Sequence, residues 1–106
     1  AGDKAGARDT RMRQGLAINR AVAADPQNLD YRDLWITLQF ALAVIDREDG
    51  KPEAGRKRLK DARAKAEDMV QRDPANRLWK ERLDQVDRRT RKFEQDVRAN
   101  NKMEAL

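Results

Sequence analysis

The sequence predicts an all-α protein of about four antiparallel helices, on the evidence of its composition, its apolar spacing and a repeated turn. Charged residues make up 41% of the 106 residues and aromatic residues only 5%. Lys, Arg, Glu, Ala and Leu dominate, a composition typical of long, solvated helices. Apolar residues recur three and four positions apart over several stretches, which is the spacing of one face of an α-helix.

A turn signal returns at a fixed distance along the chain. Asp25-Pro26-Gln27-Asn28 recurs 48 positions later (73 minus 25) as Asp73-Pro74-Ala75-Asn76. The apolar helix positions that follow the two turns correspond at the same offset: Tyr31, Trp35 and Leu38 with Trp79, Leu83 and Val86. This recurrence indicates a repeat built from one helical unit that is used more than once.

The first helix is expected over residues 9–24, after a flexible lead-in over residues 1–8. Asp9 or Thr10 is the expected N-cap, because either side chain can accept a hydrogen bond from a free first-turn amide. The helix should end just before Pro26, since a proline disfavours the α conformation of the preceding residue.

The second helix, expected over residues 29–48, has the strongest apolar pattern. One face carries Tyr31, Leu34, Trp35, Leu38, Leu42 and Ile45, and a second stripe carries Ile36, Phe40 and Val44. The helix is therefore apolar over more than half its circumference, so it is expected between neighbours or partly exposed to a partner. Gly50 and Pro52 mark its end and the start of the next helix.

Two further helices complete the predicted domain, which spans residues 9–100. The third, over residues 52–72, has a face of small and apolar residues: Gly55, Leu59, Ala62, Ala66, Met69 and Val70. The fourth, over residues 76–100 with Asn76 as its cap, has a stripe formed by Trp79, Leu83, Val86, Thr90, Phe93 and Val97. Asn100 and Asn101 interrupt that stripe, so residues 101–106 are expected to form a loose tail.

These features resemble the tetratricopeptide (TPR) repeat family, which stacks antiparallel helix pairs. Ala62, Ala66 and Pro74 stand where the family places small helix-B residues and a closing proline. The period of 48 departs from the standard repeat of about 34 residues. The chain is similar to a longer-repeat variant of bacterial signalling proteins with Asp-Pro-x-Asn-x-x-Trp joins: here the joins run from Asp73 to Trp79 and, with Tyr for Trp, from Asp25 to Tyr31.

The resemblance implies a non-catalytic scaffold, part of a larger bacterial protein, that binds a peptide or partner protein in a concave groove. The groove positions it implies are Arg32, Ile36, Gln39 and Phe40 on one helix and Lys80, Asp84, Asp87 and Arg88 on another. If Ile36 and Phe40 are exposed, they form an apolar anchor for the partner. The alternative is that both pack against the first or fourth helix. The family's carboxylate clamp is not expected, because its asparagines are absent.

Two other binding functions remain open from the residues. Basic runs at residues 56–60 and 88–92 are candidates for phosphate contacts and hence for nucleic-acid binding. Interleaved acids and the lack of stacking aromatic residues make a solvated helix face the favoured interpretation. The alternative to partner binding is self-association, through the apolar seam of the fourth helix over residues 79–97 or through an uncapped repeat edge.

Several classes of function are disfavoured by composition. The chain has no His and no Cys, so the commonest general base, thiol nucleophile and zinc ligands are missing. We therefore expect no enzyme activity, no cofactor and no metal. The longest apolar stretch, over residues 34–45, is too short to cross a bilayer. No targeting signal is visible, which slightly favours a cytoplasmic location but leaves the compartment open.

Overall fold

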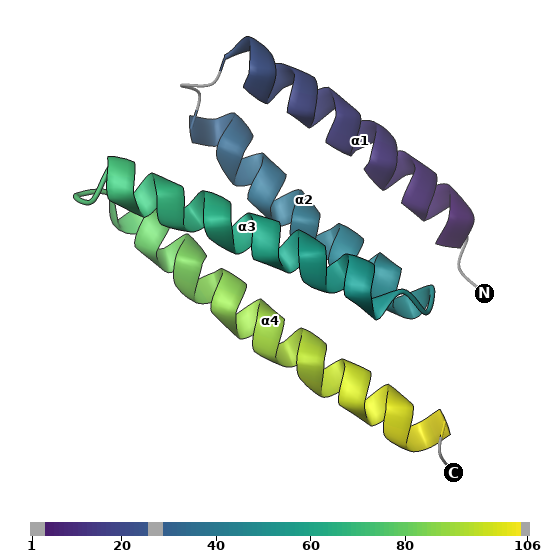
Figure 1. The fold of residues 1–106 in the computed structure, drawn as a ribbon. Coiled ribbons are helices and arrows are strands. Elements are labelled where there is room, and N and C mark those ends of the chain that lie inside the picture. The colour runs from purple at the N-terminus through teal and green to yellow at the C-terminus, as the bar shows by residue number, and fades with distance from the viewer. Residues whose placement is uncertain (1–3, 26–28, 105–106) are drawn as a thin grey trace.

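The structure, a computed structural model, describes residues 4–25 and 29–104. Within these ranges the chain forms four helices and no strand, and successive helices run antiparallel (Figure 1). The helices are α1 (Lys4–Ala24), α2 (Leu29–Glu48), α3 (Pro52–Arg72) and α4 (Arg77–Glu104). The predicted all-α class with four helices is confirmed, and α2 and α3 have the predicted bounds. The first Asp-Pro turn lies largely outside the described residues.

The first helix begins earlier than predicted. Residues 4–8 of the expected lead-in belong to α1, and Asp9 and Thr10 lie inside the helix rather than at its cap. The Thr10 hydroxyl donates to the Gly6 carbonyl one turn back (2.9 Å), as a Thr within a helix can. Arg8 forms ion pairs with Asp49 and Asp46, so this first turn is tied to the end of α2.

The helix ends follow the turn residues of the sequence. Gly50 adopts a positive φ of 77°, and the Gly50 and Lys51 amides donate to carbonyls of the last turn of α2. Gly adopts this conformation without the steric penalty that a Cβ would add. At the start of α4, the Asn76 side chain accepts a hydrogen bond from the Leu78 amide (3.0 Å), which is the predicted cap.

The fourth helix ends later than predicted. Asn100 and Asn101 are helical, and α4 continues to Glu104, so the expected tail is helical over residues 101–104. Asn costs only a few tenths of a kcal/mol more than good helix formers, and neither Gly nor Pro follows it here. Loss of the apolar stripe ends the packing surface without ending the helix.

The core lies between α2, α3 and α4. Its buried members are Ile36, Phe40 and Ala43 of α2, Leu59, Ala62, Ala66 and Met69 of α3, and Trp79, Val86, Phe93 and Val97 of α4. Gly55 lets α3 approach closely, because an added Cβ would lie 2.7 Å from the Phe93 ring and 2.9 Å from the Ala43 carbonyl oxygen. The small residues of α3 thus bring it close to its neighbours.

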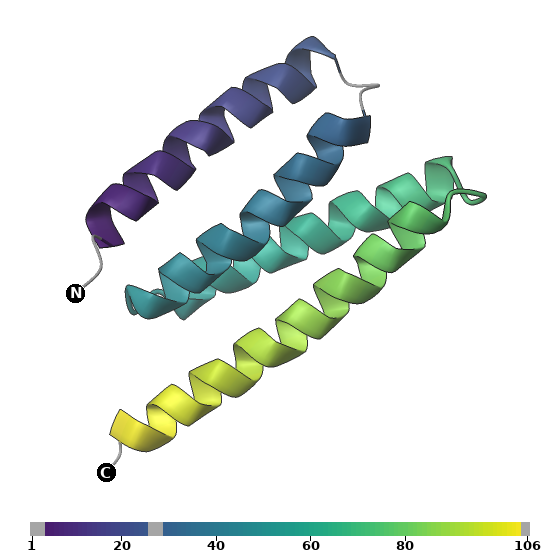
Figure 2. The ribbon, with the colours of Figure 1, turned by 180° about the vertical axis from the view of Figure 1, so that it is seen from behind.

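The helix array is elongated, with extents of 49 × 27 × 19 Å. Its radius of gyration is 15.0 Å, whereas a compact domain of this length has about 13 Å. Among the described residues, α1 contacts only α2, while α2 also contacts α3 and α4. Figure 2 shows α2 between α1 and α4, with α3 behind it. Within the described ranges, no helix is long and apolar enough to span a membrane.

Candidate protein-interaction face

One side of α2 is not covered by its neighbours. Leu34, Thr37, Ala41 and Val44 follow one another at helical spacing, and we call them the α2 stripe. Leu34 is 52% exposed and Val44 is 40% exposed. Leu34, Thr37 and Ala41 border α1, and Val44 borders α4. A partly exposed apolar strip of this kind, with a helix on each side, is a typical docking surface for a protein segment.

On its α1 side the stripe borders an open apolar groove of about 520 Å³. The α1–α2 groove is lined by Arg11, Gln14, Ala17 and Ile18 of α1 and by Leu34, Thr37, Leu38 and Ala41 of α2. It lies beside the contact between the two helices, in which Gly15 of α1 faces the Leu38 side chain. The groove can therefore accept apolar side chains without displacing a core residue.

On its α4 side the stripe reaches a smaller recess of about 50 Å³. The α2–α4 hollow is lined by Phe40, Ala43, Val44, Arg47, Leu59, Arg89, Lys92, Phe93 and Asp96. The Arg89 guanidinium carbon lies 5.4 Å from the centre of the Phe40 ring, so the cation covers the aromatic face. The Lys92 ammonium donates to Asp96 (2.9 Å), which lowers the pKa of that carboxyl.

A second contact holds α2 and α4 together further along. Arg82 of α4 donates to both carboxylate oxygens of Asp33 of α2, one of these bonds being 2.9 Å long. A bidentate pair of this kind fixes geometry as well as adding energy. The hydrogen bond to Asp33 raises the pKa of Arg82. The α4 wall of the stripe is thus held in place.

The groove positions implied by the family resemblance do not form an exposed groove. Arg32, Ile36, Gln39 and Phe40 are all buried, and Ile36 is 0% exposed. The reason is that α3 and α4 pack on the side of α2 that carries Ile36 and Phe40. The core alternative for these two residues is therefore correct, and the predicted exposed anchor is wrong.

The implied positions on α4 share one face of that helix, at the spacing i, i+4, i+7 and i+8. Asp87 accepts a hydrogen bond from Arg63 of α3 (2.8 Å). Lys80, Asp84 and Arg88 are exposed, on the side of α4 away from the buried seam. None of the four lines the α2 stripe or either recess beside it.

The residues of the α2 stripe were visible in the sequence but divided between two patterns. Leu34 belonged to the face taken as the main core stripe, and Val44 to the second stripe. Both patterns are apolar, so spacing alone could not show which edge the neighbouring helices leave open. The signal was the breadth of the apolar surface, which exceeds what the three neighbouring helices cover.

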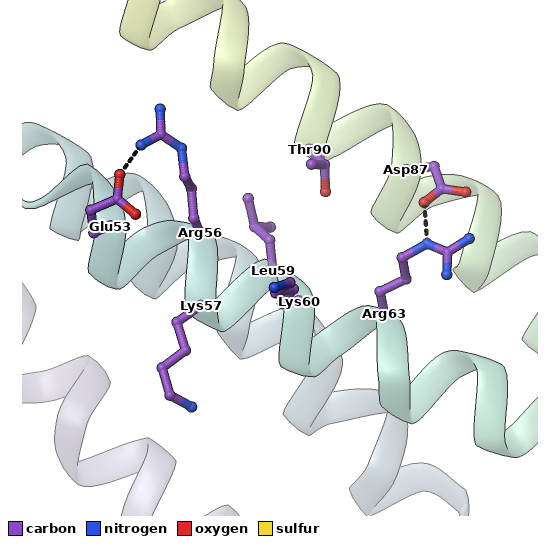
Figure 3. A pocket seen from close by; sticks show the side chains of 8 residues that line it. All are labelled: Glu53, Arg56, Lys57, Leu59, Lys60, Arg63, Asp87 and Thr90. Carbon is purple, nitrogen blue, oxygen red and sulfur yellow. Dashed lines mark hydrogen bonds and ion pairs between the residues drawn. The ribbon is translucent and has the colours of Figure 1, made fainter.

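The basic run of α3 lies beside an open groove between α3 and α4 of about 530 Å³ (Figure 3). Arg56 at one end donates to Glu94 (2.6 and 3.0 Å) and to Glu53, and these carboxylates raise its pKa. Arg63 at the other end bonds to Asp87 and Glu67, and its pKa is likewise raised. Most of the positive charge in this groove is therefore balanced locally.

Other cations of α3, in and after the basic run, also have local contacts. Arg58 donates to the buried Asp46 (2.6 Å), and Lys57 pairs with Asp61 (3.1 Å). The Lys65 ammonium lies 5.8 Å from the Trp35 ring centre. Lys60 makes no ion pair within the part of the chain that the structure describes. This arrangement favours a solvated, structurally used face over a phosphate-binding one.

The apolar seam of α4 is used inside the molecule. Trp79 and Val86 are 0% exposed, and Phe93 and Val97 are also buried. Self-association through this seam would therefore require α4 to leave its neighbours. Within residues 4–25 and 29–104, no group of three or more acidic side chains is placed to hold a metal ion.

Comparison with known proteins adds no further constraint. No family model, no curated protein and no solved structure matches the chain.

Proposed function

We propose that this chain is a non-catalytic protein-interaction module that binds a segment of a partner protein along the α2 stripe. The observation that carries the proposal is the exposure of Leu34 and Val44 on a helix whose other sides are covered. Burying such side chains in a complex is favourable, because it removes apolar surface from water.

The arrangement supports a repeat of TPR type. Each helix packs on the next, and α2 also touches α4, one repeat offset further along the chain. In this interpretation α2 and α4 are the first helices of successive pairs. Their shared outward side, which contains the α2 stripe, then corresponds to the groove side of such an array. The flanking domains of a larger bacterial protein remain part of the same proposal.

The charges around the stripe define the partner's chemistry. Arg11 lies on the α1 side, and Arg47, Arg89 and Lys92 lie on the α4 side, where Asp96 is the acidic lining residue. This positive border is complementary to a segment whose apolar side chains are flanked by Asp or Glu. We therefore propose an acidic amphipathic segment as the partner.

The test is selection of binders from a random peptide library displayed on phage, followed by affinity measurement on the isolated peptides. The proposal expects peptides with apolar residues flanked by acids. Leu34→Lys should weaken their binding about tenfold or more, because it places a cation and loses apolar contact at the centre of the surface.

The matched control is Leu16→Lys. Leu16 is 57% exposed but lies on α1 and does not line the α1–α2 groove. Both variants should keep the wild-type melting temperature, since both side chains are exposed. Equal binding by wild type and Leu34→Lys, or a loss shared by Leu16→Lys, would contradict the proposed face.

Self-association is a second candidate, favoured by one observation. Met12 and Leu16 leave 43% and 57% of their surface exposed on α1, at the edge of the array. An open repeat edge needs a cover in the intact protein. However, α1 carries five basic residues and one acidic residue, so two copies of α1 repel each other.

Light scattering after gel filtration distinguishes the two candidates. Partner binding predicts the mass of one chain at both low and high salt. A dimer that persists at high salt, and that Leu16→Lys but not Leu34→Lys dissociates, would favour self-association through α1.

A further inference from the structure

We infer that the α2–α4 hollow is a carboxylate site, in which Arg47 and Arg89 together hold an acidic side chain of the docked segment. A neighbouring apolar side chain of that segment then packs against Val44 at the mouth of the hollow. The inference rests on the proposed function and specifies its partner. It starts from two arginines that lack the carboxylate partners their neighbours have.

Arg47 is the first of these arginines. Its Nε is buried and has no hydrogen-bond partner among the residues that the structure describes. A buried donor without a partner is destabilising, so such groups are rare in folded proteins. Because Arg47 lines the hollow, an oxyanion bound there would lie beside its guanidinium.

Arg89 is the second. Its guanidinium lies over Phe40, and in the described part of the chain it makes no ion pair. Stacking on the ring uses one face of the guanidinium, while its N–H donors point outward from the edge. The ring therefore orients Arg89 and leaves its donors available to a ligand.

Among the described residues, the other cations on this side of α4 each have the carboxylate partner that Arg47 and Arg89 lack. Arg82 has Asp33, and Lys92 has Asp96. The pKa of the Asp96 carboxyl is lowered mainly by Lys92. The charge of the nearby Arg47 lowers it further. The lining residues thus carry three positive charges and one negative charge, and the hollow can accept one further carboxylate.

The size and walls of the hollow favour a side chain over an extended anion. A recess of about 50 Å³ holds a carboxylate-sized group. Phe40, Phe93 and Val44 make part of its wall apolar, which strengthens a charge-assisted hydrogen bond by excluding water. Continuity with the α2 stripe through Val44 places this carboxylate beside the apolar contacts of the same segment.

The experiment uses NMR spectra of the arginine Nε–H groups in the whole chain. Two capped helical peptides are the probes: one has Leu and Glu on a common face, and its counterpart has Gln for each Glu. The Glu peptide should shift the Arg47 and Arg89 signals saturably, leaving Arg88 unmoved. Arg88 is exposed but does not line the hollow, so it serves as the internal control.

Affinities for the Glu peptide test the same site in variants. Arg47→Gln and Arg89→Gln should each weaken binding about tenfold, the expected loss of one charge-assisted hydrogen bond. Arg88→Gln should change it less than twofold. Arg47→Gln should not melt below the wild type, because the donor it removes has no partner in the unliganded protein.

The outcomes separate this inference from the proposed function. Binding that Leu34→Lys abolishes, without movement of the Arg47 and Arg89 signals, would leave the docking face standing and overturn the carboxylate site. Signal shifts that survive Leu34→Lys would support the site and overturn the stripe. Equal affinity for the Gln peptide, or tighter binding of inorganic phosphate alone than of the Glu peptide, would overturn the acidic side chain as the ligand.

Discussion

The two sides of α2 differ in how they are packed. Towards α3 and α4, Ile36 and its neighbours join a continuous core in which Trp79 and Val86 are fully buried. Towards α1, Gly15 faces Leu38, and Arg8 forms ion pairs with Asp46 and Asp49. Met12 and Leu16 of α1 remain largely exposed.

Because of this difference, one side of α2 contributes most of the stability and the other side is available for binding. Most of the free energy of unfolding comes from α2, α3 and α4, because that is where apolar area is removed from water. The α1 side contributes less stability but leaves an open groove next to the α2 stripe. A face that binds a partner must keep apolar surface uncovered, so the loosely packed side is the one suited to it.

The largest expected effect is in the core. Trp79→Ala should lower the free energy of unfolding by about 3–5 kcal/mol, through lost burial and the cavity left behind. Leu16→Ala, on the exposed side of α1, should change it by less than about 0.5 kcal/mol. Chemical denaturation followed by circular dichroism measures both. Similar losses in the two variants would contradict the division between core and edge.

Two glycines give a matched pair on the two sides of α2. Gly55→Ala should destabilise by about 1–3 kcal/mol, because its Cβ meets the Phe93 ring and the rigid Ala43 carbonyl. A Cβ added at Gly15 would have the Leu38 Cδ2 as its nearest atom, 3.1 Å away. That side chain borders the open α1–α2 groove and can move.

Gly15→Ala should therefore be neutral or stabilising, since Ala favours a helix by about 1 kcal/mol over Gly. Thermal melting compares the two variants under one set of conditions. A loss at Gly15 as large as that at Gly55 would show that α1 is packed as tightly as α3.

The contact between α3 and α4 includes an ion pair whose contribution to stability depends on pH. The hydrogen bond from Arg56 lowers the pKa of Glu94 below its ordinary value of 4.5. A lowered folded-state pKa gives stability that is fully present above the unfolded value and is lost as pH falls through the folded value. Stability should therefore decline below pH 4.5. Glu94→Gln should make this acid decline shallower, whereas Asp9→Asn on α1 should leave it unchanged in urea melts.

How far the sequence predicts this molecule depends on the type of signal. The helix ends at Gly50 and Asn76 were predictable because each turn uses a residue whose conformation or capping bond is local. The early start of α1 was not, because the contact of Arg8 with Asp49 joins positions 41 residues apart. Local patterns contain no information about such a contact.

The candidate face shows the same limit. Spacing predicted that α2 is apolar on more than one side, and Ile36 and Phe40 were correctly recognised as apolar stripe residues. Whether Ile36 or Leu34 faces outward depends on how α4 is placed against α2, which the Asp33–Arg82 pair and the Arg89–Phe40 contact help to fix. These tertiary contacts decide the exposed edge, so the groove residues inferred from family resemblance were displaced around the helix.

The smallest expected effect concerns how α1 is held. Arg8→Gln removes the ion pairs with Asp46 and Asp49, while Asp46 keeps Arg58. Partly exposed ion pairs contribute little, so the global unfolding transition should barely move. Local opening of α1 should nevertheless become more frequent, because few buried apolar contacts oppose it. Hydrogen exchange should then show faster exchange in α1 and unchanged rates in α3; equal acceleration in both helices would mean that α1 unfolds only with the core.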